Sequence, residues 1–186
     1  MAIANRGARV VAIEPDPVWA SRLRARVREQ RGDGWVEVVE ADFRDTPLPD
    51  ERYRVISNPP FALTTVLLSY LLDHPEVGPW RADLLIQREV AHKRADSPPS
   101  TFRSAAWAPW WEFRLGPEVD RRAFRPVPAV DATVLIAERR EPPVLPTRLA
   151  PNMRALLRPG WERSARVKGA DRAIPSHVEG DARRRR

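Results

Sequence analysis

The stretch YRVISNPPFALTTVLLSYLL, from Tyr53 to Leu72, joins two apolar runs through the turn Asn58-Pro59-Pro60-Phe61. The first run, YRVIS, has the β-branched content of a buried strand that ends at Asn58. The second run is apolar over most of a helical circumference, so we expect a buried helix that stops at His74-Pro75. A strand that leads through a short turn into a helix is the repeating unit of an α/β sheet.

The same unit appears earlier in the chain. The run ARVVAIE, Ala8 to Glu14, is nearly continuous and apolar, as expected of a parallel strand covered on both faces. Asp16 can cap a helix over about 17–30, in which apolar residues recur every fourth position. After a glycine turn at 32–34, the run WVEVVEAD predicts another strand, ending at Asp42. We therefore predict a Rossmann-like sheet with right-handed crossovers.

The C-terminal half continues the sheet and then loses its periodicity. ADLLIQREVAHKRA predicts a strand and a short helix, and residues 96–103 read as a loop. WAPWWEFRL and VDATVLIAERR follow without a helical pattern, which predicts antiparallel strands at one edge, joined by the extended arm DRRAFRPVPAV. We assign residues 1–141 to one catalytic domain. Residues 142–186 are expected to form a linker, a short helix at Asn152 to Leu157 and a disordered basic tail.

Composition narrows the classes of function. The chain has 186 residues, enough for one domain with a core, and no cysteine, so a disulfide framework, a thiolate nucleophile and a cysteine-bound zinc are excluded. No apolar run approaches a membrane span, and we expect a cytoplasmic monomer without a metal. The net charge of +7 favours a polyanionic partner such as nucleic acid, although an arginine-rich codon bias would give the same charge.

Three of the predicted strands end in a polar side chain, namely Glu14, Asp42 and Asn58. Ligands of α/β sheets bind outside the carboxyl ends of the strands. A carboxylate at Glu14 could accept from ribose hydroxyls, and Asp42 could accept from an adenine amino group while Phe43 lies against the ring. Each acidic residue alone is more often a helix cap or a solvated turn, so their order and spacing carry the interpretation.

The Asn58-Pro59-Pro60-Phe61 turn suits methyl transfer to an exocyclic adenine amine. That nitrogen is a poor nucleophile because its lone pair is delocalised into the ring, and hydrogen-bond acceptors can localise the pair. The Asn58 amide oxygen and the Pro59 carbonyl can each take one N–H, while the paired proline rings hold the carbonyl direction. Phe61 can stack on a flipped base, worth roughly 1–3 kcal/mol. The plainer alternative is a proline turn that merely ends a strand.

In combination, the segments AIEPD, EADF, NPPF, LLIQREVAHKRA, WAPWWEF and FRPVPAVDATVL resemble the Erm rRNA adenine N6-methyltransferases over about residues 1–145. The resemblance implies S-adenosylmethionine as cofactor, adenine of 23S rRNA as substrate, and resistance to macrolide, lincosamide and streptogramin B antibiotics. By this likeness Glu14, Asp42, Phe43 and Asn58 would hold the cofactor, Asn58, Pro59, Pro60 and Phe61 would form the catalytic turn, and Phe124 would be a second aromatic face for the target base.

The chain departs from that pattern before Ala8. Family members carry a first strand and a glycine-rich turn there, and this sequence has no such turn. That strand sits between the strands ending at Glu14 and Asn58, so we expect these two to lack a shared partner, as in an N-terminally truncated chain. Two alternatives remain open: a methyltransferase for N6 of adenine in DNA or N5 of glutamine, and an inactive RNA-binding remnant.

Overall fold

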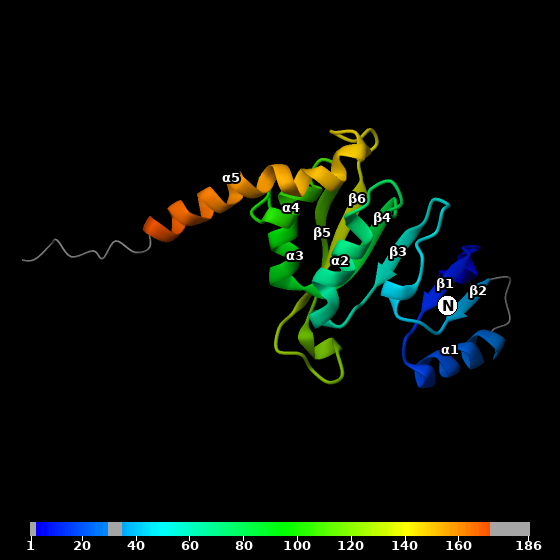
Figure 1. Cartoon of the computed structure of the whole chain (residues 1–186). Coiled ribbons are helices and arrows are strands. Elements are labelled where there is room, and N and C mark those ends of the chain that lie inside the picture. Colours follow the sequence, from blue (N-terminus) through cyan, green and yellow to red (C-terminus); the bar gives the residue numbers. More distant parts are fainter. Residues whose placement is uncertain (1–2, 30–34, 172–186) are drawn as a thin grey trace, which may run out of the picture.

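The computed structural model describes residues 3–29 and 35–171 (Figure 1). Six strands are present in this part of the chain: β1 Val10–Ile13, β2 Val36–Val39, β3 Arg54–Ser57, β4 Arg81–Gln87, β5 Trp111–Val119 and β6 Ala132–Arg139. The helices are α1 Pro17–Glu29, α2 Thr64–Leu72, α3 Arg88–Ala95, α4 Phe102–Trp107 and α5 Ala150–Asp171. Strands and helices alternate from β1 to α3, except that only a short 3-10 turn, Phe43–Asp45, separates β2 from β3, and this order confirms the predicted α/β class.

The strands form two sheets. β1 pairs in parallel with β2, and a second sheet has the order β3-β4-β6-β5. β3 and β4 are parallel, whereas β6 is antiparallel to both of its neighbours, so the predicted antiparallel edge is confirmed. In Figure 1, β1 lies between β2 and β3. Among the described residues no strand joins the two sheets, which confirms the expectation that β1 and β3 lack a shared partner.

One prediction about β1 is wrong. The sequence indicated a strand covered on both faces, but Val11 is 46% exposed and Ile13 is 41% exposed. Ile56 of β3 is likewise exposed, at 55%. Each of these two strands pairs on one side only, and Val11, Ile13 and Ile56 are left exposed on them.

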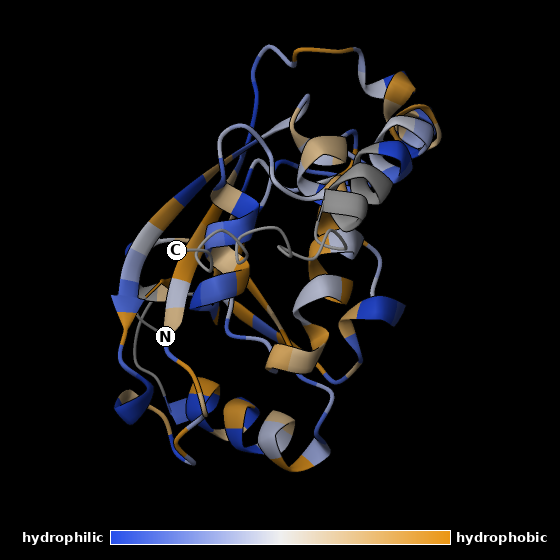
Figure 2. Ribbon diagram, turned by 90° about the vertical axis from the view of Figure 1, so that its left-hand side faces the viewer, coloured by the Kyte–Doolittle hydropathy of each residue, from blue (hydrophilic) through white to orange (hydrophobic). Residues whose placement is uncertain are grey.

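The core lies between the larger sheet and the helices that follow its strands. It is built from leucines of α2, alternate residues of β4 and β6, and three tryptophans, Trp107, Trp110 and Trp111, each at most 2% exposed. Each indole N–H donates a hydrogen bond, to Asp73, to the Leu145 carbonyl and to the Leu72 carbonyl respectively. The tryptophan-rich segment therefore stabilises the core through both packing and hydrogen bonds. Figure 2 shows hydrophobic and hydrophilic residues alternating along the helices.

The structure corrects two C-terminal predictions. The predicted strand at WAPWWEFRL begins at Trp111, because residues 102–107 form α4, whose N-terminus is capped by the Thr101 hydroxyl accepting from Ser104 N–H at 3.1 Å. Helix α5 is far longer than the predicted Asn152 to Leu157 and contains Pro159. Its Trp161 packs against Phe102 of α4, with ring centroids 6.1 Å apart. The basic tail, residues 172–186, lies outside the described residues.

Candidate active site

Glu14 and Asp42 lie at the carboxyl edge of the small sheet. Ile13 pairs with Val39, and the Glu14 N–H donates to the Val39 carbonyl at 3.0 Å. Glu14 Oε1 accepts from the Asp16 N–H at 2.9 Å. Asp16 caps α1 as predicted, because its Oδ1 accepts from the Val18 N–H at 2.8 Å. The Glu14 carboxylate thus retains unused acceptor positions at the strand end.

The Asp42 carboxylate is clamped by Arg44, a contact that the sequence reasoning missed. Oδ1 accepts from the Arg44 backbone N–H and from Nε, both at 2.9 Å, and Oδ2 accepts from Nη2 at 2.6 Å. These hydrogen bonds to the Arg44 side chain and backbone lower the pKa of Asp42 to about 2. Asp42 is therefore an ionised acceptor at neutral pH, and its oxygens are already partly engaged.

Phe43 links this loop to the larger sheet. Its ring meets Tyr70 of α2 edge-on, with centroids 5.6 Å apart, and the Tyr70 hydroxyl donates to the Thr46 carbonyl. Burial raises the pKa of Tyr70, so the hydroxyl stays protonated as a donor. Because α2 starts just after the proline turn, this contact ties the Asp42 loop to the same helix that the turn introduces.

The proline turn leaves β3 at the carboxyl edge of the larger sheet. Asn58 follows Ser57, which pairs with Leu84 of β4. Pro59 is buried, whereas Asn58 and Pro60 are exposed and Phe61 is half-buried. The Pro60 carbonyl accepts from Leu63 N–H at 2.8 Å and starts the short turn before α2.

The two acceptors of the turn are unpaired in the described part of the chain. Within residues 3–29 and 35–171, neither the Asn58 side chain nor the Pro59 carbonyl has a hydrogen-bond partner. Asn58 is exposed, so its amide oxygen can meet a ligand from solvent. Two unsatisfied acceptors therefore stand next to one another on a rigid backbone at the end of a strand.

The arm that carries Phe124 begins and ends at the same edge. Val119 pairs with Ala132, and Ala132 also pairs with Gln87 at the end of β4. Figure 1 shows the loop between β5 and β6 at the edge where the turn after β3 runs into α2. Phe124 is half-buried and closes a short helical turn, with its N–H donating to the Arg121 carbonyl at 3.2 Å. Among the described residues, Phe124 makes no ring contact with Phe61.

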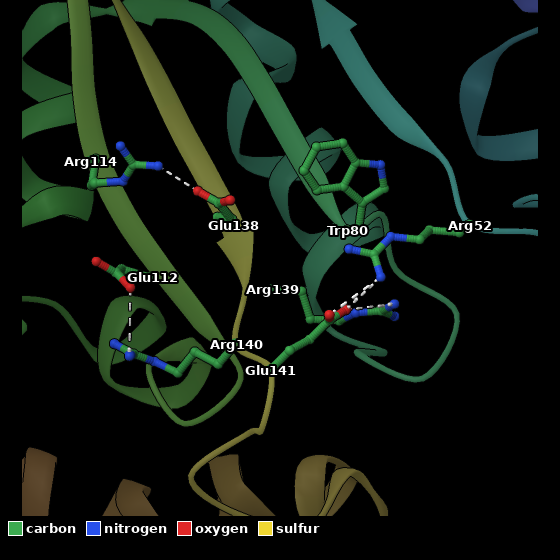
Figure 3. A pocket seen from close by; sticks show the side chains of 8 residues that line it. All are labelled: Arg52, Trp80, Glu112, Arg114, Glu138, Arg139, Arg140 and Glu141. Carbon is green, nitrogen blue, oxygen red and sulfur yellow. Dashed lines mark hydrogen bonds and ion pairs between the residues drawn. The ribbon is translucent and has the colours of Figure 1, made fainter.

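One cavity lies away from these residues. A cavity of about 510 Å³ opens at the opposite edge of the sheet, where β4 and β5 begin, and Figure 3 shows that its charged side chains are paired with one another. Arg52 and Arg139 both contact Glu141, and Arg114 contacts Glu138. This set of mutual ion pairs is a solvated surface network rather than a catalytic cleft.

A second cavity of about 490 Å³ lies beside the Asp42 loop and is lined by Arg44 and Tyr70 among others, but not by Glu14 or Asn58. No cluster of metal-ligating side chains occurs within the described residues. None of the helices described is long and apolar enough to cross a membrane.

Neither of the two cavities is lined by Glu14 or Asn58. The predicted site is therefore an open sheet edge.

Comparison with known proteins identifies relatives of this architecture. An rRNA adenine N-6-methyltransferase of Corynebacterium diphtheriae is 39% identical over 145 residues, covering 77% of this chain and 54% of the relative. The mycinamicin-resistance protein MyrB of Micromonospora griseorubida is 39% identical over 150 residues, covering 80% of this chain and 46% of the relative. The chain thus spans about half the length of the curated relatives it matches.

Solved structures agree with the fold. The 23S rRNA methyltransferase ErmE superposes with a TM-score of 0.69 at 27% identity, covering 81% of this chain and 60% of the other. A dimethyladenosine transferase from Plasmodium falciparum, at 23% identity and a TM-score of 0.62, shares the fold. The family model described as ribosomal RNA adenine dimethylase matches residues 1–159. The chain therefore belongs to the ribosomal RNA adenine dimethylase family.

Proposed function

We propose that this chain carries the catalytic turn of a 23S rRNA adenine N6-methyltransferase that uses S-adenosylmethionine and confers macrolide, lincosamide and streptogramin B resistance. The observation that carries the proposal is the pair of acceptors at the end of β3, the Asn58 amide and the Pro59 carbonyl, that have no hydrogen-bond partner among the described residues. Family membership and the names of the relatives support rRNA as the substrate class.

The residues at the neighbouring strand ends fit the adenosine part of the cofactor. Glu14 offers carboxylate lone pairs for ribose hydroxyls, since its one internal bond comes from a backbone N–H. Asp42 stays ionised and can accept from the adenine amine through the lone pairs that Arg44 does not use. The Phe43 ring meets Tyr70 in a T-shaped contact, and the part of the ring that Tyr70 leaves free would meet the adenine.

The bound cofactor supplies an electrophilic methyl group, and the chain prepares the nitrogen that receives it. The Asn58 amide oxygen and the Pro59 carbonyl each accept one hydrogen of the adenine amine, which localises the nitrogen lone pair. Pro60 fixes the direction of the preceding carbonyl with little conformational freedom. Phe61 and Phe124 stack on the base once it leaves its helix.

The direct test is Asn58→Ala in a methylation assay with labelled cofactor and 23S rRNA. The variant loses an acceptor that acts on the reacting nitrogen, so we expect turnover to fall at least 100-fold, on the order found for preorganised hydrogen bonds. Asn58 is exposed and bonds to nothing in the described chain, so the melting temperature should not change. Asn152→Ala, at an exposed position of α5, is the matched control. Near-normal turnover by Asn58→Ala would rule out the assignment.

Parallel assays separate the alternatives. Labelled methyl transfer to rRNA, duplex DNA and protein distinguishes the proposed enzyme from methyltransferases that act on DNA adenine or glutamine. Calorimetry with S-adenosylmethionine distinguishes an enzyme from an inactive remnant, because a remnant gives no saturable binding yet still shifts RNA in a salt-dependent manner.

A further inference from the structure

Asp131 occupies the junction between three parts of the larger sheet. It directly precedes Ala132, the first residue of β6, and its carbonyl accepts from the Arg88 N–H at 3.0 Å, where β4 passes into α3. Its side-chain Oδ1 accepts from the Arg121 N–H at 3.1 Å. One residue therefore connects the end of β4, the start of β6 and the beginning of the arm that carries Phe124.

The contact to Arg121 closes the base of the arm. The two residues lie ten positions apart in the sequence, and a second bond, from Arg121 Nη1 to the Ala129 carbonyl at 3.1 Å, spans the same opening. The Arg121 carbonyl in turn accepts from the Phe124 N–H at 3.2 Å. Two consecutive hydrogen bonds thus run from the Asp131 carboxylate to the Phe124 backbone.

The other hydrogen bonds within the arm join residues that are close in the sequence. Asp120 Oδ1 accepts from the Arg122 N–H at 2.7 Å, only two residues away, and shapes the turn without fixing it to the sheet. The arm residues 121–123 are exposed, so packing does not hold them either. Without the Asp131 carboxylate, only the bond from Arg121 Nη1 to the Ala129 carbonyl would span the opening, which leaves more conformations to Phe124.

The charged side chains near Asp131 favour the position in which its carboxylate accepts from the Arg121 N–H. Arg88 Nη1 lies 3.9 Å from Asp131 Oδ2 and 3.6 Å from Glu118 Oε2, so the guanidinium is shared between the two carboxylates. His92, one turn further along α3, lies 3.8 Å from Glu118. The cation keeps the Asp131 carboxylate beside the end of β4 while its other oxygen reaches the arm.

We propose that Asp131 is a positioning residue that sets the place of Phe124 at the catalytic edge by closing the base of arm 120–131. The catalytic consequence of this proposal rests on the proposed function. The hydrogen bonds that close the base of the arm do not depend on that function. Among the described residues Asp131 forms no hydrogen bond with the proline turn or with Phe124, and it acts through the Arg121 backbone. Preorganised placement of a stacking face matters because small displacements of a substrate-positioning group reduce turnover strongly.

The test compares Asp131→Ala with Asp131→Asn and with Asp120→Ala as the matched control in the same arm. Asparagine keeps an Oδ1 acceptor for the Arg121 N–H, whereas alanine removes it. NMR-detected amide exchange should show Arg121 and Phe124 exchanging about tenfold faster in Asp131→Ala, and within about twofold of wild type in the other two variants. The amides of β6 should be unchanged, which excludes a global loss of stability.

The methylation assay adds the catalytic readout. In Asp131→Ala we expect kcat on rRNA to fall about tenfold with KM for RNA changed less than about twofold, and Asp131→Asn should restore kcat. Unchanged exchange at Phe124, an equal effect of Asp120→Ala, or an unchanged kcat in an opened arm would overturn the proposal. If the wild-type chain methylates no RNA, the proposed function fails, while the exchange comparison still decides whether Asp131 anchors the arm.

Discussion

At the scale of single residues, the clamp on Asp42 shows how a neighbour sets the chemistry of a candidate ligand. Arg44 forms three hydrogen bonds with the Asp42 carboxylate, two of them from the guanidinium. A carboxylate whose folded pKa lies below its ordinary value stabilises the fold above the unfolded pKa, and this contribution is lost as the pH falls through the folded pKa. For Asp42 that window lies between 3.8 and about 2.

Arg44→Ala should raise the pKa of Asp42 towards 3.8, because the two guanidinium hydrogen bonds that stabilise the charged form are lost while the backbone N–H of residue 44 remains. Carbon-detected NMR of the carboxyl group between about pH 5 and 2.5 measures this directly, since the variant should complete most of its titration in that range, whereas wild type should reach only about one quarter protonation at its lower end. Arg26→Ala, on the exposed face of α1, is the control and should leave the Asp42 signal as in wild type. A midpoint for Asp42 that does not move in Arg44→Ala would contradict the assigned cause.

The roles of individual residues differ in how well they could be predicted from the sequence. The helix cap by Asp16 was predicted from its place before Pro17, because capping is a local rule, and the structure confirms it. The Arg44 clamp was missed although it lies two residues from Asp42, since a charged pair in a turn has many possible geometries. The contact between Asp131 and Arg121 joins distant positions and leaves no signal in a single sequence.

At the scale of elements, the connection between α2 and β4 depends on a close approach at Gly78. A Cβ built there would meet the Leu71 carbonyl oxygen at 2.7 Å and the Trp111 ring at 2.8 Å. Both obstacles belong to the packed core, one to the backbone of α2 and one to a fully buried ring, so neither can move cheaply.

Gly78→Ala should therefore lower the free energy of unfolding by roughly 1–3 kcal/mol, as overpacking does. Gly160 of α5 is the matched control, because a Cβ added there would have no neighbouring atom within 4 Å. Gly160→Ala should be neutral or stabilising by up to about 1 kcal/mol through helix propensity. Urea unfolding of the two variants measures the difference. Equal stability of Gly78→Ala and wild type would show that the α2 to β4 connection is looser than described.

Helices and strands whose apolar residues recur with one clear period were predicted well. Elements whose sequence patterns conflict were not. Helix α1 and the strands β3 and β4 agree with their predictions because apolar spacing and flanking turns pointed the same way. Helix α4 was missed because residues 102 and 103 were read as loop and Trp107 as the start of an edge strand, whereas tertiary packing places Trp107 at a helix end. Helix α5 was cut short since Pro159 breaks the local pattern, while the contact of Trp161 with Phe102 supports the helix beyond it.

At the scale of the whole molecule, the two sheets are held together by few contacts. An ion pair joins Arg9 to Glu51 at 3.7 Å between exposed groups, and the Phe43 ring meets Tyr70 of α2. A surface ion pair of this kind contributes little. A two-stranded sheet whose valines and isoleucines are exposed buries little apolar surface of its own, and a pair of strands is marginal in water. The sheet of β3 to β6, by contrast, contains the tryptophan core.

Hydrogen exchange should therefore divide the chain into two levels of protection. Glu14 N–H bonds to the Val39 carbonyl at 3.0 Å and Arg139 N–H bonds to the Trp80 carbonyl at 2.9 Å, so the two amides are matched in geometry and in position at a strand end. We expect the segment 10–14 to exchange at least about 100-fold faster than 132–139, because opening the small sheet exposes far less apolar surface than opening the core. Mass-spectrometric exchange at neutral pH measures both segments in one experiment. Equal protection would mean that β1 and β2 unfold only together with the larger sheet, and that the Phe43 and Tyr70 contact couples the two sheets far more strongly than its buried area suggests.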